Sequence, residues 1–144
     1  MLGRNLDFIF ECKYIGREDE CTIGCTKCAI GFKKAGDNAL AHKEYDEAIK
    51  CYKKAIFMEP EYVEAWNGLA YIYDIKHEFE NSLRAYDRAI EIDSTYGKAL
   101  YGKAITLRNM GLNVEAIKLA ASILEMYNDS EVKSFKESLE RLYY

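Results

Sequence analysis

The sequence predicts an all-α protein built as a solenoid of antiparallel helix pairs. Three observations support this prediction. One period of 34 residues runs through three consecutive copies. Within each copy, large apolar and small residues recur at steps of three and four, the spacing of a helix. Proline occurs once in 144 residues, which favours helices over a loop-rich all-β fold.

Six sets of residues keep the period without a gap. They are Phe32, Trp66 and Leu100; Gly36, Ala70 and Ala104; Ala39, Tyr73 and Leu107; Ala48, Ser82 and Ala116; Tyr52, Tyr86 and Ala120; and Ala55, Ala89 and Ile123. Two antiparallel helices pack closely only where side chains are small. We therefore expect Gly36, Ala70 and Ala104 to lie at close helix contacts.

Each copy carries two apolar stripes separated by a polar break, such as Lys76-His77-Glu78. This pattern predicts a helix, a short turn and a second helix. Pro60 ends one of the second helices because proline cannot continue it. The expected pairs are 29–42 with 45–58, 63–76 with 79–92, and 97–110 with 113–126.

These motifs resemble the tetratricopeptide repeat. The resemblance rests on Trp66-x-x-Leu69-Ala70-x-x-Tyr73, on Ser82-x-x-x-Tyr86-x-x-Ala89, and on the run from Tyr45 to Pro60. It implies a right-handed α-solenoid with repeats at 29–62, 63–96 and 97–130. The third copy departs from the pattern at Lys103, Ala120, Ile123 and Asn128. The alternative is an unrelated helical bundle with accidental periodicity.

Two segments flank the repeats. Residues 131–144 resemble the capping helix of such arrays, and Ser130 can cap its start. Its apolar stripe consists of Val132, Phe135, Leu139 and Leu142. Residues 1–28 form a cysteine-containing extension, which we expect to be helical and packed on the first repeat.

The extension holds Cys12, Cys21, Cys25 and Cys28. The spacing of the last three looks like the iron–sulfur motif of the radical SAM enzymes, but nothing in the chain reads as the βαβ units those enzymes need. Four thiolates could also hold a tetrahedral zinc ion. Cys21, Cys25 and Cys28 continue in register into Phe32, so we predict apolar packing on one helix and no metal.

Composition narrows the function. A net charge of −4 disfavours nucleic acid, which binds basic surfaces. No apolar run is long enough to span a bilayer, and the N-terminus does not read as a secretory signal, so we expect a cytoplasmic protein with reduced cysteines. There is no phosphate-binding glycine loop and no supported catalytic triad. We predict no enzymatic activity and no cofactor.

The expected function is protein binding on the concave face, which the first helix of each pair lines. The resemblance assigns to this face a mixture of tyrosine, polar and charged residues: Lys33, Asp37, Leu40, Asn67, Tyr71, Asp74, Lys98, Tyr101, Ile105 and Arg108. Such a mixture suits an extended peptide or a partner helix. We expect the outer residues of the second helices, such as Lys50, Lys53, Arg84 and Arg88, to be interchangeable solvated surface.

Two alternatives and one exclusion complete the prediction. The first alternative is a metal or redox module acting through the N-terminal cysteines, and the second is an accessory part of an enzyme complex. Related modules that hold the C-terminal carboxylate of heat-shock chaperones use a clamp of two lysines, two asparagines and a further basic residue. Lys33 and Lys98 match its lysines, but the other positions hold Asp37, Gly68 and Gly102. We therefore expect no such clamp.

Overall fold

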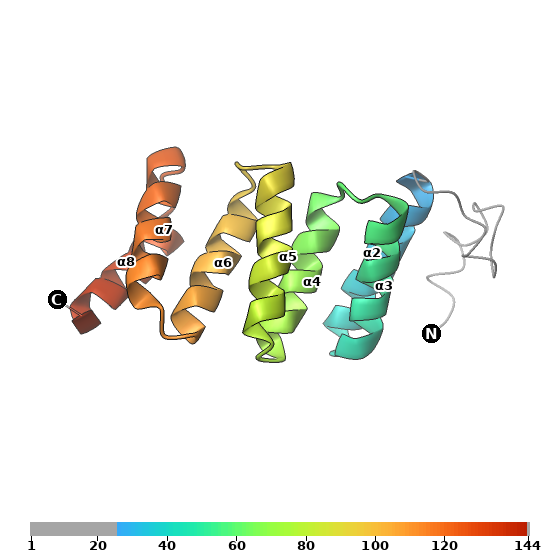
Figure 1. The fold of residues 1–144 in the computed structure, drawn as a ribbon, viewed down its shortest axis with the longest axis horizontal. Helices are drawn as coiled ribbons and strands as arrows, with labels where there is room; N and C mark the ends of the chain where they lie inside the picture. The colour runs from blue at the N-terminus through green and yellow to red at the C-terminus, as the bar shows by residue number, and fades with distance from the viewer. Residues whose placement is uncertain (1–25, 144) are drawn as a thin grey trace.

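The computed structural model describes residues 26–143, which form seven helices and no strand within that range (Figure 1). The helices are α2 (Thr26–Ala41), α3 (Tyr45–Met58), α4 (Val63–Ile75), α5 (Phe79–Ile92), α6 (Gly97–Asn109), α7 (Asn113–Met126) and α8 (Ser130–Tyr143). They stand side by side along the long axis, and successive helices run in opposite directions. The predicted all-α helix pairs are confirmed, with boundaries within a few residues.

The three turns inside the pairs share one geometry. Lys43, His77 and Gly111 all adopt a positive φ, of 60°, 60° and 81°. The backbone N–H of the residue that follows each of them donates to a carbonyl in the last turn of the first helix, as from Glu44 to Ala39 at 2.9 Å. This arrangement satisfies carbonyls that the helix end would leave unpaired. Glycine adopts such a φ at little cost, whereas Lys43 and His77 hold it without that advantage.

Small residues bring the helices of each pair together, as the pattern predicts. Ala70 and Ala104 are fully buried. Gly36 lies against the ring of Tyr52, and a Cβ atom added there would come within 2.8 Å of it. The core therefore runs through the array between α2 and α8 as clusters shared by neighbouring helices.

The last helix closes the array with one change from expectation. Val132, Phe135 and Leu139 are buried against α6 and α7, as the stripe predicts. Leu142 lies on the same stripe but is 75% exposed, because it sits in the last turn of α8. The start of α8 is capped by Asp129, whose Oδ1 accepts from the backbone N–H groups of Glu131 and Val132 at 2.8 and 3.2 Å. The expected cap at Ser130 was wrong by one residue.

Two of the five cysteines, Cys28 and Cys51, lie within the described residues. Cys28 is buried beside Ala29 and Met58 near the start of α2, as apolar packing requires. Cys51 is buried in α3, where burial raises the pKa of its thiol. Cys12, Cys21 and Cys25 lie outside the described residues. The single helix predicted to carry Cys21, Cys25 and Cys28, and the packing of the extension on the first repeat, therefore stay predictions.

Candidate partner-binding surfaces

The first helices form one continuous surface, because α4 packs on both α2 and α6. This surface corresponds to the expected concave face. The second helices α3, α5 and α7 form the opposite face, which is turned toward the viewer in Figure 1. The two faces differ in which of their polar side chains are held in ion pairs or hydrogen bonds within the protein.

On α2, the charged groups satisfy one another. Lys33 Nζ lies 2.7 Å from Asp37 Oδ2, and the buried Tyr52 hydroxyl donates to Asp37 Oδ1 at 2.6 Å. Burial and this acceptor raise the pKa of Tyr52 far above its usual value. Burial alone would lower the pKa of Lys33, but the hydrogen bond and charge of Asp37 raise it overall. Lys33 therefore remains a cation whose charge Asp37 has already neutralised.

The middle of the surface formed by the first helices carries its most exposed aromatic side chain. Tyr71 on α4 is 48% exposed, whereas its neighbour Asn67 is partly buried. Asp74, one turn further, accepts from Asn109 Nδ2 at 3.3 Å and so ties α4 to α6. Tyr71 is thus the aromatic residue of this face most available to a ligand.

Of the expected contact residues on α6, one points into solvent and the others pack against the C-terminal part of the array. Lys98 is exposed, and no ion pair among the described residues includes it. Tyr101 instead meets the Phe135 ring edge-on at 5.6 Å, and Ile105 packs against the same core cluster. The Arg108 guanidinium also lies over the Phe135 ring, 5.3 Å from its centre. The structure therefore brings Tyr101 and Arg108 onto α8, and Ile105 onto the core cluster that α6, α7 and α8 share.

The two glycines at the clamp positions have a structural role. A Cβ atom at Gly68 would come within 2.6 Å of the Tyr52 ring, and one at Gly102 within 2.4 Å of the Tyr86 ring. Each tyrosine thus reaches from a second helix to the first helix of the next copy. An asparagine or arginine could not stand at either position without displacing a buried ring. The sequence alone gave these glycines no role in packing.

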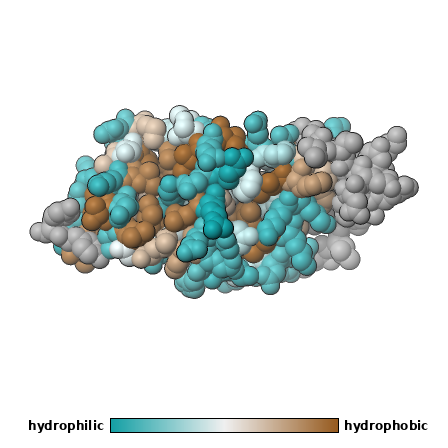
Figure 2. Space-filling model, viewed as in Figure 1, coloured by the Kyte–Doolittle hydropathy of each residue, from teal (hydrophilic) through white to brown (hydrophobic). Residues whose placement is uncertain are grey.

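The opposite face holds a groove that the sequence did not reveal. Its floor is formed by Trp66, Leu69 and Tyr73 of α4, and its volume is about 630 Å³. Its walls come from α3 and α5 and include Lys53, Arg84 and Arg88. Figure 2 shows this face with hydrophilic side chains over α5 and hydrophobic surface on either side. The basic residues expected to be interchangeable surface therefore surround one apolar floor.

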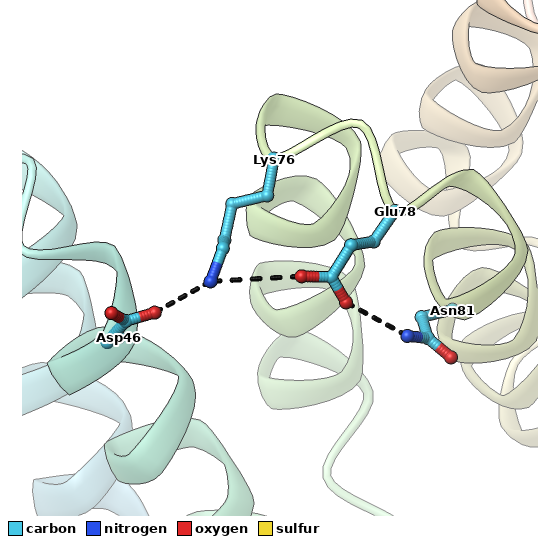
Figure 3. Close-up of polar contacts among 4 residues, drawn as sticks. All are labelled: Asp46, Lys76, Glu78 and Asn81. Carbon is cyan, nitrogen blue, oxygen red and sulfur yellow. Dashed lines mark hydrogen bonds and ion pairs between the residues drawn. The ribbon is translucent and has the colours of Figure 1, made fainter.

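A polar network joins the first two copies at the end of the helices (Figure 3). Lys76 Nζ lies 2.7 Å from Asp46 Oδ1 on α3 and 3.7 Å from Glu78 Oε1. Glu78 in turn accepts from Asn81 Nδ2 at 3.0 Å. The hydrogen bond from Lys76 lowers the pKa of Asp46. Solvent reaches these groups, so the network adds little stability.

The described residues contain no cluster of three or more potential metal ligands. Because Cys12, Cys21 and Cys25 fall outside those residues, this finding does not test the predicted absence of metal in the extension. None of the described helices combines the length and apolar character needed to cross a membrane.

Known proteins share both the sequence pattern and the fold. Residues 33–97 match the tetratricopeptide repeat family. Superkiller protein 3 of Saccharomyces cerevisiae is 28% identical over 94 residues, which is 65% of this chain. The peroxisomal targeting signal receptor of Eremothecium gossypii is 29% identical over 87 residues, which is 60% of this chain. The chain spans only 7% and 15% of the lengths of these two relatives.

Solved structures extend the likeness across most of the chain. The first tetratricopeptide domain of Spaghetti (RPAP3), bound to HSP90 peptide SRMEEVD, superimposes with a TM-score of 0.77 at 22% identity. That match covers 81% of this chain and 94% of the other. The N-terminal domain of stress-induced protein-1 from C. elegans gives a TM-score of 0.73 at 22% identity, over 83% of this chain and 99% of that one. Residues 33–97 therefore carry tetratricopeptide repeats, and the described helices have the fold of solved tetratricopeptide domains.

Proposed function

We propose that this domain binds a peptide or an extended segment of a partner protein along its concave face, and that it performs no chemistry of its own. The observation that supports this most is Tyr71, which is 48% exposed at the middle of the surface formed by α2, α4 and α6. Tyrosine offers a large contact area at low entropic cost. The helices around it are held rigid, so a ligand need not order them.

The solved neighbours support a peptide ligand in general. One is bound to an HSP90 peptide, and another, the second such domain of human RPAP3, is in complex with HSP70 peptide SGPTIEEVD. The surface of this chain argues for a different ligand. Asp37 would repel a terminal carboxylate, and Gly68 and Gly102 are held against tyrosine rings. We therefore propose a partner that is not recognised by its C-terminal carboxylate.

The exposed charged side chains of this surface suggest how such a segment would lie. Lys98 and Arg108 are exposed on α6, and both take no part in the ion pairs of the described residues. Glu64 is exposed on α4 and lies close enough to Lys33 to raise the pKa of that lysine. A ligand with an acidic residue over α6 and a basic residue over α4 would complement both. Its neutral or aromatic middle would meet Tyr71.

The experiment compares captured proteins across variants. Immobilised wild-type protein, Tyr71→Ala and Lys118→Ala are incubated with lysate of the source cells, and the retained proteins are identified by mass spectrometry. Lys118 is exposed on α7, on the opposite face, and serves as the matched control. A partner should be kept by wild type and Lys118→Ala and weakened by more than about 1 kcal/mol in Tyr71→Ala. A partner retained equally by all three would contradict the assignment.

Tyr101→Ala and Arg108→Ala should weaken the same partner. Both residues also pack on Phe135, so their melting temperatures must be measured beside their affinities. Tyr71 carries the decisive comparison because its ring is exposed, whereas the ring of Tyr101 is half-buried.

A further inference from the structure

The groove over Trp66, on the face opposite the proposed peptide site, has the make-up of a second binding site. Trp66, Leu69 and Tyr73 form an apolar floor between α3 and α5. The cavity of about 630 Å³ is within the size range of ligand pockets and can hold one or two large side chains.

The rim of this groove is basic. Arg88 is paired with Glu91 at 2.5 Å, and Asp87 with Lys103 at 2.6 Å. Lys53 and Arg84 are exposed on the two walls, and neither belongs to an ion pair among the described residues. Two cations with no ion-pair partner among the described residues therefore line the groove with its apolar floor, in a chain whose net charge is −4.

The residues of the next junction in the array differ from those that line this groove. One period later, Leu69 is replaced by Lys103 and Ala85 by Leu119. Lys103 Nζ reaches Asp87 on α5, and Leu119 packs against the C-terminal core cluster. A lysine held in an ion pair and a leucine therefore take the places of two residues that line the groove between α3 and α5. The groove results from the particular residues of the first two copies.

We propose that this groove binds an acidic segment of a partner protein, with an apolar side chain seated on Trp66 and carboxylates meeting Lys53 and Arg84. Charge complementarity selects the acidic ligand, and the aromatic floor selects the apolar side chain. Arg88 already covers the Trp66 ring, with its guanidinium 5.8 Å from the ring centre, so an incoming side chain would displace or join that contact. This site is separate from the concave face and does not depend on the proposed function there.

The chain contains its own reporter for this site. Trp66 is the single tryptophan of the chain, so all tryptophan fluorescence comes from the floor of this groove. The test titrates the full chain with a capped peptide of sequence EELEELEE and records Trp66 emission. We expect a saturable change in emission with the acidic peptide and none with its basic counterpart KKLKKLKK.

Matched variants locate the binding. Arg84→Glu and Lys53→Glu should each weaken the acidic peptide at least about tenfold, which corresponds to about 1.4 kcal/mol. Lys118→Glu changes the position one period after Arg84, and it should leave the affinity unchanged. Circular dichroism of each variant checks that these exposed substitutions keep the helices. An unchanged emission, or an equal loss in Lys118→Glu, would overturn the site.

Two further arms separate this proposal from others. Tyr71→Ala should not alter the emission titration, so a loss there would move the peptide to the concave face and overturn the groove assignment. A single-stranded oligothymidylate should bind much more weakly than the acidic peptide, and equal binding would overturn the choice of a protein ligand. If the acidic peptide does not bind the groove, the proposed function can still be tested. The Arg84→Glu variant should then capture the same partners of the concave face as wild type.

Discussion

The junction between copies one and two and the junction between copies two and three use the same backbone geometry and different chemistry. At the first, Ala48 and Ile72 are buried as an apolar pair. One period later the same positions hold Ser82 and Thr106, whose hydroxyl oxygens lie 3.3 Å apart in the core. The comparison shows that the fold specifies size at these positions and tolerates a change of polarity where each polar group finds a partner.

The turn between α4 and α5 and the turn between α6 and α7 also differ in their side chains. Lys76 and Glu78 form the charged network that meets Asp46, whereas the equivalent residues of the third copy are Met110 and Leu112. Met110 and Leu112 are 36% and 40% exposed, and the turn between them keeps its geometry. The turn therefore depends on its backbone hydrogen bonds and not on the ion pairs around it.

The largest expected effect concerns the ring at the first junction. Tyr52→Ala should cost about 3–5 kcal/mol of unfolding free energy, because it empties the space between Gly36 and Gly68. Tyr52→Phe removes only the hydrogen bond to Asp37 and should cost clearly less. Urea unfolding of both variants measures the difference. Equal losses would mean that the hydrogen bond, and not the ring, fixes this junction.

A second prediction tests the corresponding contact at the next junction. Gly102→Ala places a Cβ atom 2.4 Å from the Tyr86 ring and should cost about 1–3 kcal/mol. In a Tyr86→Ala background the clash is gone, and the same change should stabilise by up to about 1 kcal/mol through helix propensity. Thermal unfolding of the four proteins in this cycle gives the sign. Destabilisation in both backgrounds would rule out the ring as the cause.

A third prediction converts one junction into the other. Ser82→Ala removes the hydrogen bond to the Ala70 carbonyl and the contact with Thr106, and should cost about 1 kcal/mol. Adding Thr106→Ile recreates the apolar pair of the first junction and should recover most of that loss. Urea unfolding of the single and double variants tests this. Strictly additive losses would show that the two sites are not interchangeable.

The smallest effect is expected at the charged network. Asp46 has a pKa lowered chiefly by the hydrogen bond from Lys76, so the stability it contributes is present above its ordinary pKa of about 3.9 and is lost as the pH falls through the lowered value. Lys76→Met should therefore lower the melting temperature slightly at neutral pH and not at all in strong acid. High salt should shrink the difference. A difference that persists in acid would point to lost packing of the lysine stem.

The sequence predicted those features that depend on period and size. The burial of Ala70 and Ala104 follows from spacing alone, because a small residue at a helix contact leaves a periodic trace. The groove over Trp66 could not be predicted in this way, since it is a gap between α3 and α5 and depends on how far apart two helices stand. A one-dimensional pattern gives the face of a residue and not the distance to the next helix.

The surroundings of the residues expected on the concave face were predicted only in part, and their role in binding stays a prediction. The position of Tyr71 followed from the repeat, and its exposure agrees with that placement. The sequence did not predict the contact of Tyr101 and Arg108 with Phe135, because a capping helix does not by itself imply that α8 lies beside α6 as a first helix would. The spacing of Phe135, one period after Tyr101, was the available signal.

The contact between a tyrosine and the glycine of the next copy also determines where the array can grow. A duplicate of residues 63–96, inserted after residue 96, would place the ring of Tyr86 against a second Gly68 and its own tyrosine against Gly102. Insertion after the third copy meets no such match, because Ala120 stands where the tyrosine would be and Lys136 where the glycine would be. Duplication of the second copy can thus lengthen the array and keep the tyrosine–glycine contact at every new junction. The junction between the third copy and α8 lacks this contact and cannot accept a further copy in the same way.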